Sequence, residues 1–239
     1  MILQTGGETM NILSKLFRTL PTFLLLLSLS ALCSAQDKKK IAYAILLDNT
    51  GSMRSQFDMV TGIGKAVAQQ IHDHGPVSLF DFASAGQVRG AGAVVTPRIE
   101  QTQDEQLLKH TIDNLYVEGG QTTLLDAIQL IADRLGEKAG GPDFSARVII
   151  LITDGEERTS VVRQKQLLQK LSELKIHVYA IGLVQQLSSE GGFTRPSKRS
   201  KAVELLKDIT KETGGRVVFP KSDRQDLQSL LAELAIPIQ

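Results

Sequence analysis

Two uninterrupted apolar segments, each followed by an aspartate, constrain the fold of this chain more than any other feature. Ile41–Leu47 is followed directly by Asp48, and Val148–Ile152 is followed by Thr153 and Asp154. A strand with one solvent-exposed face alternates apolar and polar residues, whereas an apolar run without alternation is typical of a strand buried on both faces. Both segments therefore predict central strands of a parallel sheet that is covered on each side by helices.

The rest of the chain alternates between helical and strand patterns. Apolar spacing predicts helices over 53–72, 104–115, 123–136, 160–174, 200–212 and 227–234, and strands over 77–82, 176–183 and 217–219. A further strand is predicted over 88–96 at an edge of the sheet, because Gly90, Gly92 and Pro97 disfavour a central position. This order predicts an α/β domain with a doubly wound, mostly parallel sheet, helices on both faces and one antiparallel edge strand.

The first 35 residues have the pattern of an export signal. Lys15 and Arg18 precede the apolar run Leu20–Leu32, and small residues at Cys33 and Ala35 predict cleavage after Ala35. The apolar run has about 13 residues, whereas a membrane-spanning helix needs roughly 20.

We therefore predict a signal peptide over 1–35, a polar leader over 36–40 and a single domain over 41–237. The expected location is secreted or periplasmic, with no membrane span in the mature chain. An uncleaved anchor is the alternative interpretation of the apolar run, and Met10 is an alternative start to Met1.

Charge and cysteine content narrow the classes of partner and chemistry. The formal net charge is +1 at pH 7, which gives no indication of nucleic acid or an anionic membrane surface as a partner. Cys33 is the only cysteine and leaves with the signal peptide. The mature chain is therefore expected to have neither disulfides nor thiol chemistry.

Three short segments are expected to meet at one edge of the sheet. They are Asp48-Asn49-Thr50-Gly51-Ser52, Gly119-Gly120-Gln121-Thr122-Thr123 and Thr153-Asp154-Gly155. In a doubly wound sheet, ligands bind beyond the carboxyl ends of the strands, near the point where the strand order reverses. The segments offer two carboxylates and several hydroxyls without cysteine or histidine, which suits a hard cation: Mg²⁺ first, then Mn²⁺ or Ca²⁺. The alternative is that the aspartates only cap helices.

In their order and spacing, these segments resemble the metal-ion-dependent adhesion site (MIDAS) of von Willebrand factor type A (VWA) domains. That family has the pattern Asp-x-Ser-x-Ser, a later Thr and a later Asp, and the similarity covers about residues 40–237. The chain departs from the pattern at Thr50, which keeps a hydroxyl where the family usually has Ser. It is similar to the stand-alone exported members that occur in bacteria.

The resemblance implies a Rossmann-like VWA fold and a specific set of metal ligands. These are Asp48, Thr50, Ser52, Thr122 and Asp154, with Thr122 favoured over Thr123. It also implies that an Asp or Glu of a partner protein completes the coordination of the metal. The implied function is adhesion, assembly or sensing through protein binding rather than catalysis.

Two other functions stay open on the sequence alone. The Ser-, Gly- and charge-rich segment 185–199 is expected to form an exposed loop that could serve as a metal-independent interaction scaffold. A Mg²⁺-dependent hydrolase would need a base or nucleophile beside the metal, and the histidines are distant in the pattern. The segment Glu156-Glu157-Arg158 either tunes partner choice or forms the solvated start of a helix. A basic cluster is interpreted as a solvated face, with a specific anionic contact as the alternative, and consists of Arg195, Lys198, Arg199 and Lys201.

Overall fold

The structure, a computed structural model, describes residues 40–84, 93–120, 122–138, 144–192, 195–221 and 225–238. All of them belong to one compact unit, Lys39–Gln239. The predicted signal peptide over 1–35 and residues 36–39 of the leader lie outside the described residues. Of the helices that the structure describes, none has the length and apolar character needed to cross a membrane.

One mostly parallel sheet forms the centre of the described unit. Its strands are β1 (Lys40–Asp48), β2 (Val77–Ser84), β3 (Ala93–Thr102), β4 (Phe144–Thr153), β5 (Ile176–Gly182) and β6 (Val217–Val218). Their order in the sheet is β3-β2-β1-β4-β5-β6, so the strand order reverses between β1 and β4. The edge strand β3 is antiparallel to β2, and the other neighbours are parallel. The predicted doubly wound sheet with one antiparallel edge strand is confirmed.

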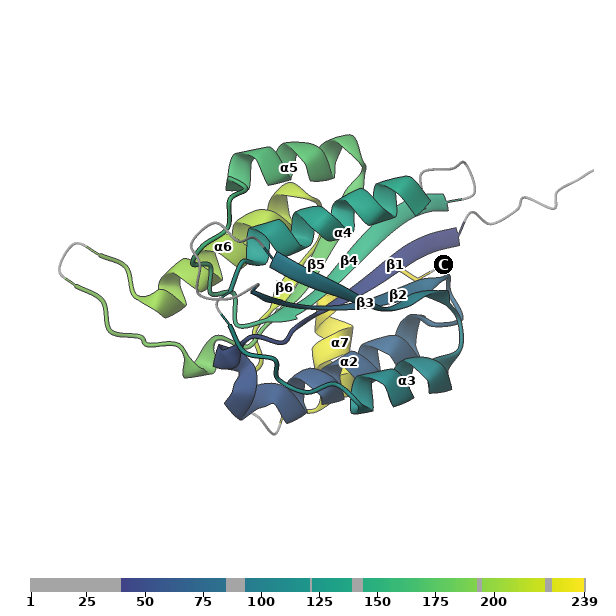
Figure 1. The fold of residues 1–239 in the computed structure, drawn as a ribbon, viewed down its shortest axis with the longest axis horizontal. Coiled ribbons are helices and arrows are strands. Elements are labelled where there is room, and N and C mark those ends of the chain that lie inside the picture. The colour runs from purple at the N-terminus through teal and green to yellow at the C-terminus, as the bar shows by residue number, and fades with distance from the viewer. Residues whose placement is uncertain are drawn as a thin grey trace, which may run out of the picture. The chain divides into compact units, whose positions relative to one another are not determined.

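Helices cover both faces of this sheet (Figure 1). They are α2 (Phe57–Ile71), α3 (Glu105–Asp113), α4 (Leu124–Lys138), α5 (Gln164–Glu173), α6 (Lys198–Glu212) and α7 (Leu227–Leu234), with the short 3₁₀ helices η1 (Gly51–Gln56) and η2 (Val184–Gln186). The helices α2, α3 and α7 lie on one face, and α4, α5 and α6 lie on the other.

Successive side chains of β1 enter different hydrophobic cores. Tyr43, Ile45 and Leu47 pack in the core under α2, α3 and α7. Ala44 and Leu46 pack in the core under α4, α5 and α6. Because alternate residues of a strand point to opposite faces, a strand covered on both sides must be apolar at every position. The unalternated sequence thus correctly predicts a central strand.

The edge strand differs from its predicted position over 88–96. β3 begins at Ala93, continues through Pro97 and ends at Thr102, and residues 88–92 lie outside the described part of the chain. Pro97 is paired with Phe80, where the register with β2 shifts. A proline lacks an amide donor, but an edge strand with an irregular register tolerates that loss. The proline therefore does not end the strand.

Several helix boundaries also differ from the prediction. The helix expected over 53–72 is divided into η1 and α2, which begins at Phe57. The helix expected from residue 160 begins only at Gln164. Ser197 accepts a hydrogen bond from the amide of Ser200 and caps α6, so this helix begins at Lys198 inside the segment predicted as the loop 185–199. That segment also contains part of η2.

Candidate metal site

The candidate site lies at the carboxyl ends of β1 and β4, where the strand order reverses. Leu47 of β1 pairs with Ile152 of β4, so Asp48 and Thr153 occupy the adjacent ends of two neighbouring strands. Asp154 follows directly. Loops that leave a sheet at such a point diverge to opposite faces and leave room for a ligand between them.

Thr50 links the first aspartate to the other candidate ligands. Its amide and its hydroxyl both donate to Asp48 Oδ1, at 3.0 and 2.6 Å. Thr50 Oγ1 lies 3.1 Å from Ser52 Oγ and 3.5 Å from Thr122 Oγ1. Ser52 in turn interacts with the carboxylate of Asp154, whose pKa burial raises and this contact lowers. The structure therefore brings all five candidate ligands into one network.

Thr123, the next residue along, has a different environment from Thr122. Its carbonyl accepts the amide of Ala127 at 3.1 Å and so begins the hydrogen bonding of α4. Its hydroxyl is buried and has no hydrogen-bond partner among the described residues. Thr122 is thus the threonine of this pair whose hydroxyl reaches the Asp48 segment.

The two aspartates are buried carboxylates, and neither forms an ion pair with a described residue. Asp48 is 0% exposed and Asp154 is 1% exposed. Burial, followed by the nearby charge of Asp154, raises the pKa of Asp48 to about 7. Burial also raises the pKa of Asp154. Two ionised carboxylates in a low-dielectric site are stable only with a compensating positive charge, and a divalent cation would supply it.

The oxygen atoms at this site fit a hard cation. Among the described residues, no group of three or more His, Cys, Asp or Glu side chains could hold a metal. A metal here would therefore need hydroxyl ligands as well as the two carboxylates. Such an all-oxygen set suits Mg²⁺, Mn²⁺ or Ca²⁺, whereas Zn²⁺ prefers nitrogen and sulfur.

Thr153 contributes to the site in a way that the sequence analysis did not identify. Its hydroxyl donates to Asp48 Oδ2 at 2.5 Å and accepts the amide of Gly155 at 3.0 Å. Gly155 has a φ of +73°, and a Cβ there would lie 2.8 Å from Leu206 Cδ1. The position of Thr153, a hydroxyl residue directly before an aspartate at a strand end, was the available signal.

The loop after Asp154 is attached to the beginning of α4. Glu157 Oε2 accepts the amide of Leu125 at 3.0 Å, and Asp126 accepts the amide of Val162 at 2.9 Å. The amide of Arg158 donates to the carbonyl of Thr122 at 3.1 Å. A carboxylate at a helix N-terminus satisfies otherwise free amides. Glu157 therefore joins the loop that carries Asp154 to the loop that carries Thr122.

Glu156 lies on the other side of this loop, towards α6. It is only 8% exposed and pairs with Arg158 at 2.5 Å and Lys198 at 3.0 Å. Burial opposes its ionisation, but these contacts outweigh burial and lower the pKa of Glu156. Because Glu156 is buried and Glu157 caps α4, the interpretation of this segment as a solvated helix start is wrong.

A hollow of about 550 Å³ adjoins the candidate site between this loop and α6. Its lining combines charged and apolar side chains: Gly155, Glu156, Glu157, Arg158, Lys198, Lys201, Ala202 and Leu205. Two members of the predicted basic cluster have different partners. Lys198 pairs with Glu156, whereas Arg199 donates to the carbonyls of Gln185 and Leu187.

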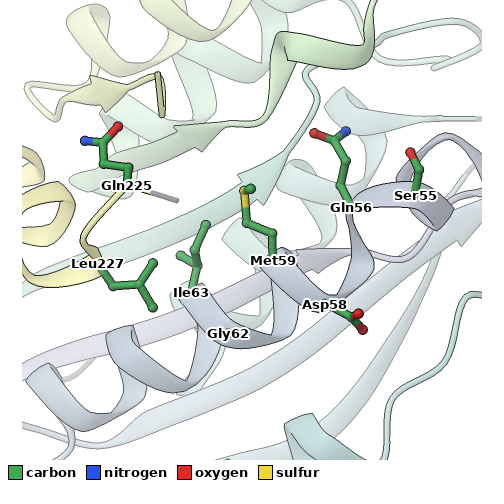
Figure 2. A pocket seen from close by; sticks show the side chains of 8 residues that line it. All are labelled: Ser55, Gln56, Asp58, Met59, Gly62, Ile63, Gln225 and Leu227. Carbon is green, nitrogen blue, oxygen red and sulfur yellow. The ribbon is translucent and has the colours of Figure 1, made fainter. Parts of the chain in front are cut away.

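Another pocket, of about 380 Å³, lies between α2 and the start of α7. Figure 2 shows the apolar side chains of Met59, Ile63 and Leu227 along it, with Gln56 and Gln225 near its ends. Its lining includes none of the five candidate ligands and a single carboxylate, Asp58. The pair of buried carboxylates is therefore at the strand ends and not in this pocket.

Comparisons with known proteins agree with this architecture. The family model of the von Willebrand factor type A domain matches residues 44–233, a range that contains all five candidate ligands. A search of curated proteins finds no significant match.

Solved structures with the same fold include three proteins of different origin. Proximal thread matrix protein 1 from the mussel byssus has 19% identity and a TM-score of 0.59, with 82% of this chain and 47% of that chain covered. The conserved hypothetical protein BatB from Bacteroides thetaiotaomicron has 17% identity and a TM-score of 0.57, with 82% and 98% covered. The pilus adhesin SpaC from Lactobacillus rhamnosus GG, in an open conformation, has 15% identity and a TM-score of 0.59, with 83% and 30% covered.

These structural similarities, at identities of 15 to 19%, show a shared fold. The chain spans about half the length of the mussel protein and about a third of the pilus adhesin. The family model, by contrast, matches the sequence itself over most of the chain, residues 44–233. This chain therefore belongs to the von Willebrand factor type A domain family, a family of protein-interaction and adhesion modules.

Proposed function

We propose that this protein is a metal-dependent protein-binding module. One divalent cation, Mg²⁺ foremost and otherwise Mn²⁺ or Ca²⁺, would be held by Asp48, Thr50, Ser52, Thr122 and Asp154. The observation that carries the proposal is the burial of two carboxylates beside three hydroxyls without an ion pair among the described residues. When bound, the cation supplies a coordination position for an oxygen from outside the chain.

The proposed partner is a protein that presents an Asp or Glu at this position. The two aspartates balance the charge of one divalent cation, so an incoming carboxylate is not repelled as it would be from a metal-free site. Tyr116 and Val161 are each 66% exposed, the highest values among the large apolar side chains of the described residues. They lie in the loops that lead to Thr122 and follow Asp154. In these loops, both side chains are available for contact with a partner protein.

We further propose that the module is not an enzyme. A metal-dependent hydrolase needs a general base or nucleophile beside the metal. The ring of His72 contacts the carbonyl of Gln103 at 3.2 Å, and that of His177 contacts the carbonyl of Thr213 at 2.7 Å. The hydrogen bonds among the five candidate ligands involve carboxylates, hydroxyls and backbone amides. This set is suited to holding a cation, and both of its carboxylates would be engaged by that cation rather than free to act as a general base.

We also propose that the protein is exported to the periplasm or secreted. The support for this proposal is the basic start, apolar run and small residues of segment 1–35. Amino-terminal sequencing of the protein from the exporting compartment tests it, and Gln36 is the expected first residue.

Capture of partners from that compartment tests the proposed function. Wild-type protein and Asp48→Ala would be compared as bait with Mg²⁺ and with a chelator, and bound proteins identified by mass spectrometry. A partner retained only by wild-type protein with Mg²⁺, and lost when its own acidic residue is changed to the amide, is the expected result. A partner retained equally in every condition would contradict it.

Two further measurements separate the alternative functions. Replacing residues 188–196, within the segment 185–199, with a short Gly-Ser linker abolishes capture if the segment 185–199 acts as a metal-independent scaffold, and Asp48→Ala then has no effect. Steady Mg²⁺-dependent turnover of phosphoesters, lost in Asp154→Ala, would identify a hydrolase instead.

A further inference from the structure

Four polar residues, three through their side chains and Glu118 through its side chain and backbone amide, form a closed hydrogen-bonded ring beside the candidate metal site. Arg98 of β3 donates to both carboxylate oxygens of Asp81, at 2.6 and 2.9 Å, and to Glu118 at 2.8 Å. Asn49 donates to Asp81 Oδ2 at 2.7 Å and accepts the backbone amide of Glu118 at 2.8 Å. The ring joins the end of β1, the strands β2 and β3, and the loop that leads to Thr122.

The antiparallel pairing of β2 and β3 produces this ring. Asp81 lies opposite Thr96, and the register shifts between Leu79 and Phe80, so Arg98 lies at the irregularity of β3, two residues beyond the partner of Asp81. Asp81 is 1% exposed. A charge buried to this degree within a strand destabilises the fold unless it is paired and hydrogen-bonded. Arg98 supplies the pairing through two parallel N–H donors, a geometry that lysine cannot reproduce.

The loop that carries Thr122 depends on such anchoring because its own backbone is permissive. Gly119 and Gly120 have φ angles of +94° and +82°, a region that glycine adopts without a steric penalty. On the Thr122 side, the loop is attached through the amide of Arg158. At its other end, Glu118 holds the loop: its amide donates to Asn49 and its carboxylate accepts from Arg98.

The ring also controls how this loop meets the first ligand segment. The carbonyl of Asn49 accepts the amide of Gly119 at 3.4 Å. A Cβ on Gly51 would lie 3.7 Å from Gly119 Cα and from the carbonyl oxygen of Gly120. Asn49 thus contacts the glycine loop with its backbone and side chain while lying between Asp48 and Thr50 in sequence. Asn49 and Glu118 therefore attach the end of the glycine loop that precedes Thr122 to the segment that carries Asp48 and Thr50.

We propose that Arg98, on the edge strand, is a positioning residue that holds Glu118 and Gly119, in the loop that leads to Thr122, in register with the Asp48 segment before any metal binds. The part of this inference that concerns metal affinity rests on the proposed function, whereas the ordering of the loop does not. Groups that orient ligands from outside the coordination sphere typically change metal affinity by 10- to 100-fold when they are removed.

Two measurements on three variants test this role. Arg98→Met removes the guanidinium and keeps an apolar stem of similar length, and Glu118→Gln removes only the charge that Arg98 contacts in the loop. Arg134→Met is the matched control, because Arg134 pairs with Glu100 of the same strand but has no hydrogen bond to the described residues of the loop. Amide exchange of Glu118 and Gly119 is followed by NMR in metal-free protein, and Mn²⁺ binding is followed by electron paramagnetic resonance.

The expected result is a local effect. In Arg98→Met, the amides of Glu118 and Gly119 exchange at least about tenfold faster, and the Kd for Mn²⁺ rises about tenfold. Glu118→Gln shows smaller changes in the same direction, and it keeps the pairing of the buried Asp81, so it serves as the test if Arg98→Met does not fold. Amides in the middle of β1 remain as protected as in the wild type, and Arg134→Met changes neither measurement by more than about twofold.

Wild-type exchange at Glu118 and Gly119 in the folded variants would overturn the positioning role. Faster exchange without any loss of Mn²⁺ affinity would overturn its link to the metal. If wild-type protein itself bound no Mn²⁺, the proposed metal site would fail, and the exchange measurement in metal-free protein would still decide whether Arg98 orders the loop.

Discussion

The hydroxyl of Thr153 donates a 2.5 Å hydrogen bond to Asp48 Oδ2 and so joins the ends of the two central strands. The other oxygen of the Asp48 carboxylate accepts the amide and hydroxyl of Thr50. Both oxygens of this buried group are therefore fixed by neighbours before a cation arrives. These hydrogen bonds favour the ionised carboxylate and oppose the effect of burial.

Thr153→Val is expected to weaken metal binding without removing a candidate ligand. Loss of the hydroxyl leaves Asp48 Oδ2 without this donor, which raises the pKa of Asp48 further and lets the carboxylate rotate. We expect the Kd for Mn²⁺ to rise about tenfold at pH 7, with a smaller rise at pH 8.5, where Asp48 is ionised in both proteins. Thr111→Val, which removes a hydroxyl bound to the carbonyl of Leu107 on α3, is the control. Equal affinities in all three proteins would contradict a role for Thr153.

The neighbouring threonines 122 and 123 are expected to differ sharply. Thr122→Val removes a hydroxyl that lies 3.5 Å from Thr50 Oγ1, and we expect at least a tenfold loss of Mn²⁺ affinity. Thr123→Val removes a buried hydroxyl that has no hydrogen-bond partner among the described residues. Since an apolar group of the same shape avoids that unsatisfied donor, this variant should bind Mn²⁺ normally and unfold at the same or a higher denaturant concentration. A reversed pattern would identify Thr123 as the ligand.

The stability of the metal-free protein should depend on pH through Asp48. An unfolded aspartate ionises near pH 3.9, whereas burial and Asp154 raise the pKa of Asp48 to about 7 in the folded protein. Between these values the folded state binds more protons than the unfolded state, so this group makes the free energy of unfolding fall as the pH rises towards 7. Urea denaturation from pH 4.5 to 8 should show this decrease in wild-type protein, relative to Asp48→Asn. If the free energy of unfolding of both proteins changed with pH in the same way, Asp48 would not be the source of the pH dependence.

Two glycines provide a matched test of the backbone at the site. Gly155→Ala forces a side chain into the left-handed region and against Leu206, so we expect a loss of about 1–3 kcal/mol in the free energy of unfolding. Gly62 lies in α2, and a Cβ there would meet no atom within 4 Å. Gly62→Ala should therefore increase stability by about 0.5–1 kcal/mol. Chemical denaturation measures both, and similar effects of the two substitutions would contradict the described turn at Gly155.

The central strands and the candidate ligands could be predicted because their signals are local. A strand buried on both faces is apolar at each position, and this pattern is visible in Ile41–Leu47 without knowledge of its neighbours. Asp48 is the last residue of β1 and Asp154 directly follows β4, and parallel strands end at the same edge of the sheet. The family motif then identifies Thr122 as the ligand from the segment between them, and the structure places the Thr122 hydroxyl beside Thr50.

The supporting contacts could not be predicted because they depend on tertiary register. Arg98 reaches Asp81 only through the antiparallel register of β2 and β3, which the sequence does not specify. Glu157 caps α4, an element that begins more than thirty residues earlier, so no capping pattern appears near either segment. Asp81 was the visible signal, since a carboxylate within an apolar strand indicates that a buried partner lies nearby.

Calorimetric titration of metal-free protein with Mg²⁺ and Mn²⁺, with Asp48→Ala and Thr123→Val alongside, tests the central claim most directly. We expect one ion to bind per wild-type chain, the same binding in Thr123→Val, and no measurable binding in Asp48→Ala. Wild-type protein that takes up neither ion, or an Asp48→Ala variant that binds as well as wild type, would contradict a metal site at the ends of β1 and β4.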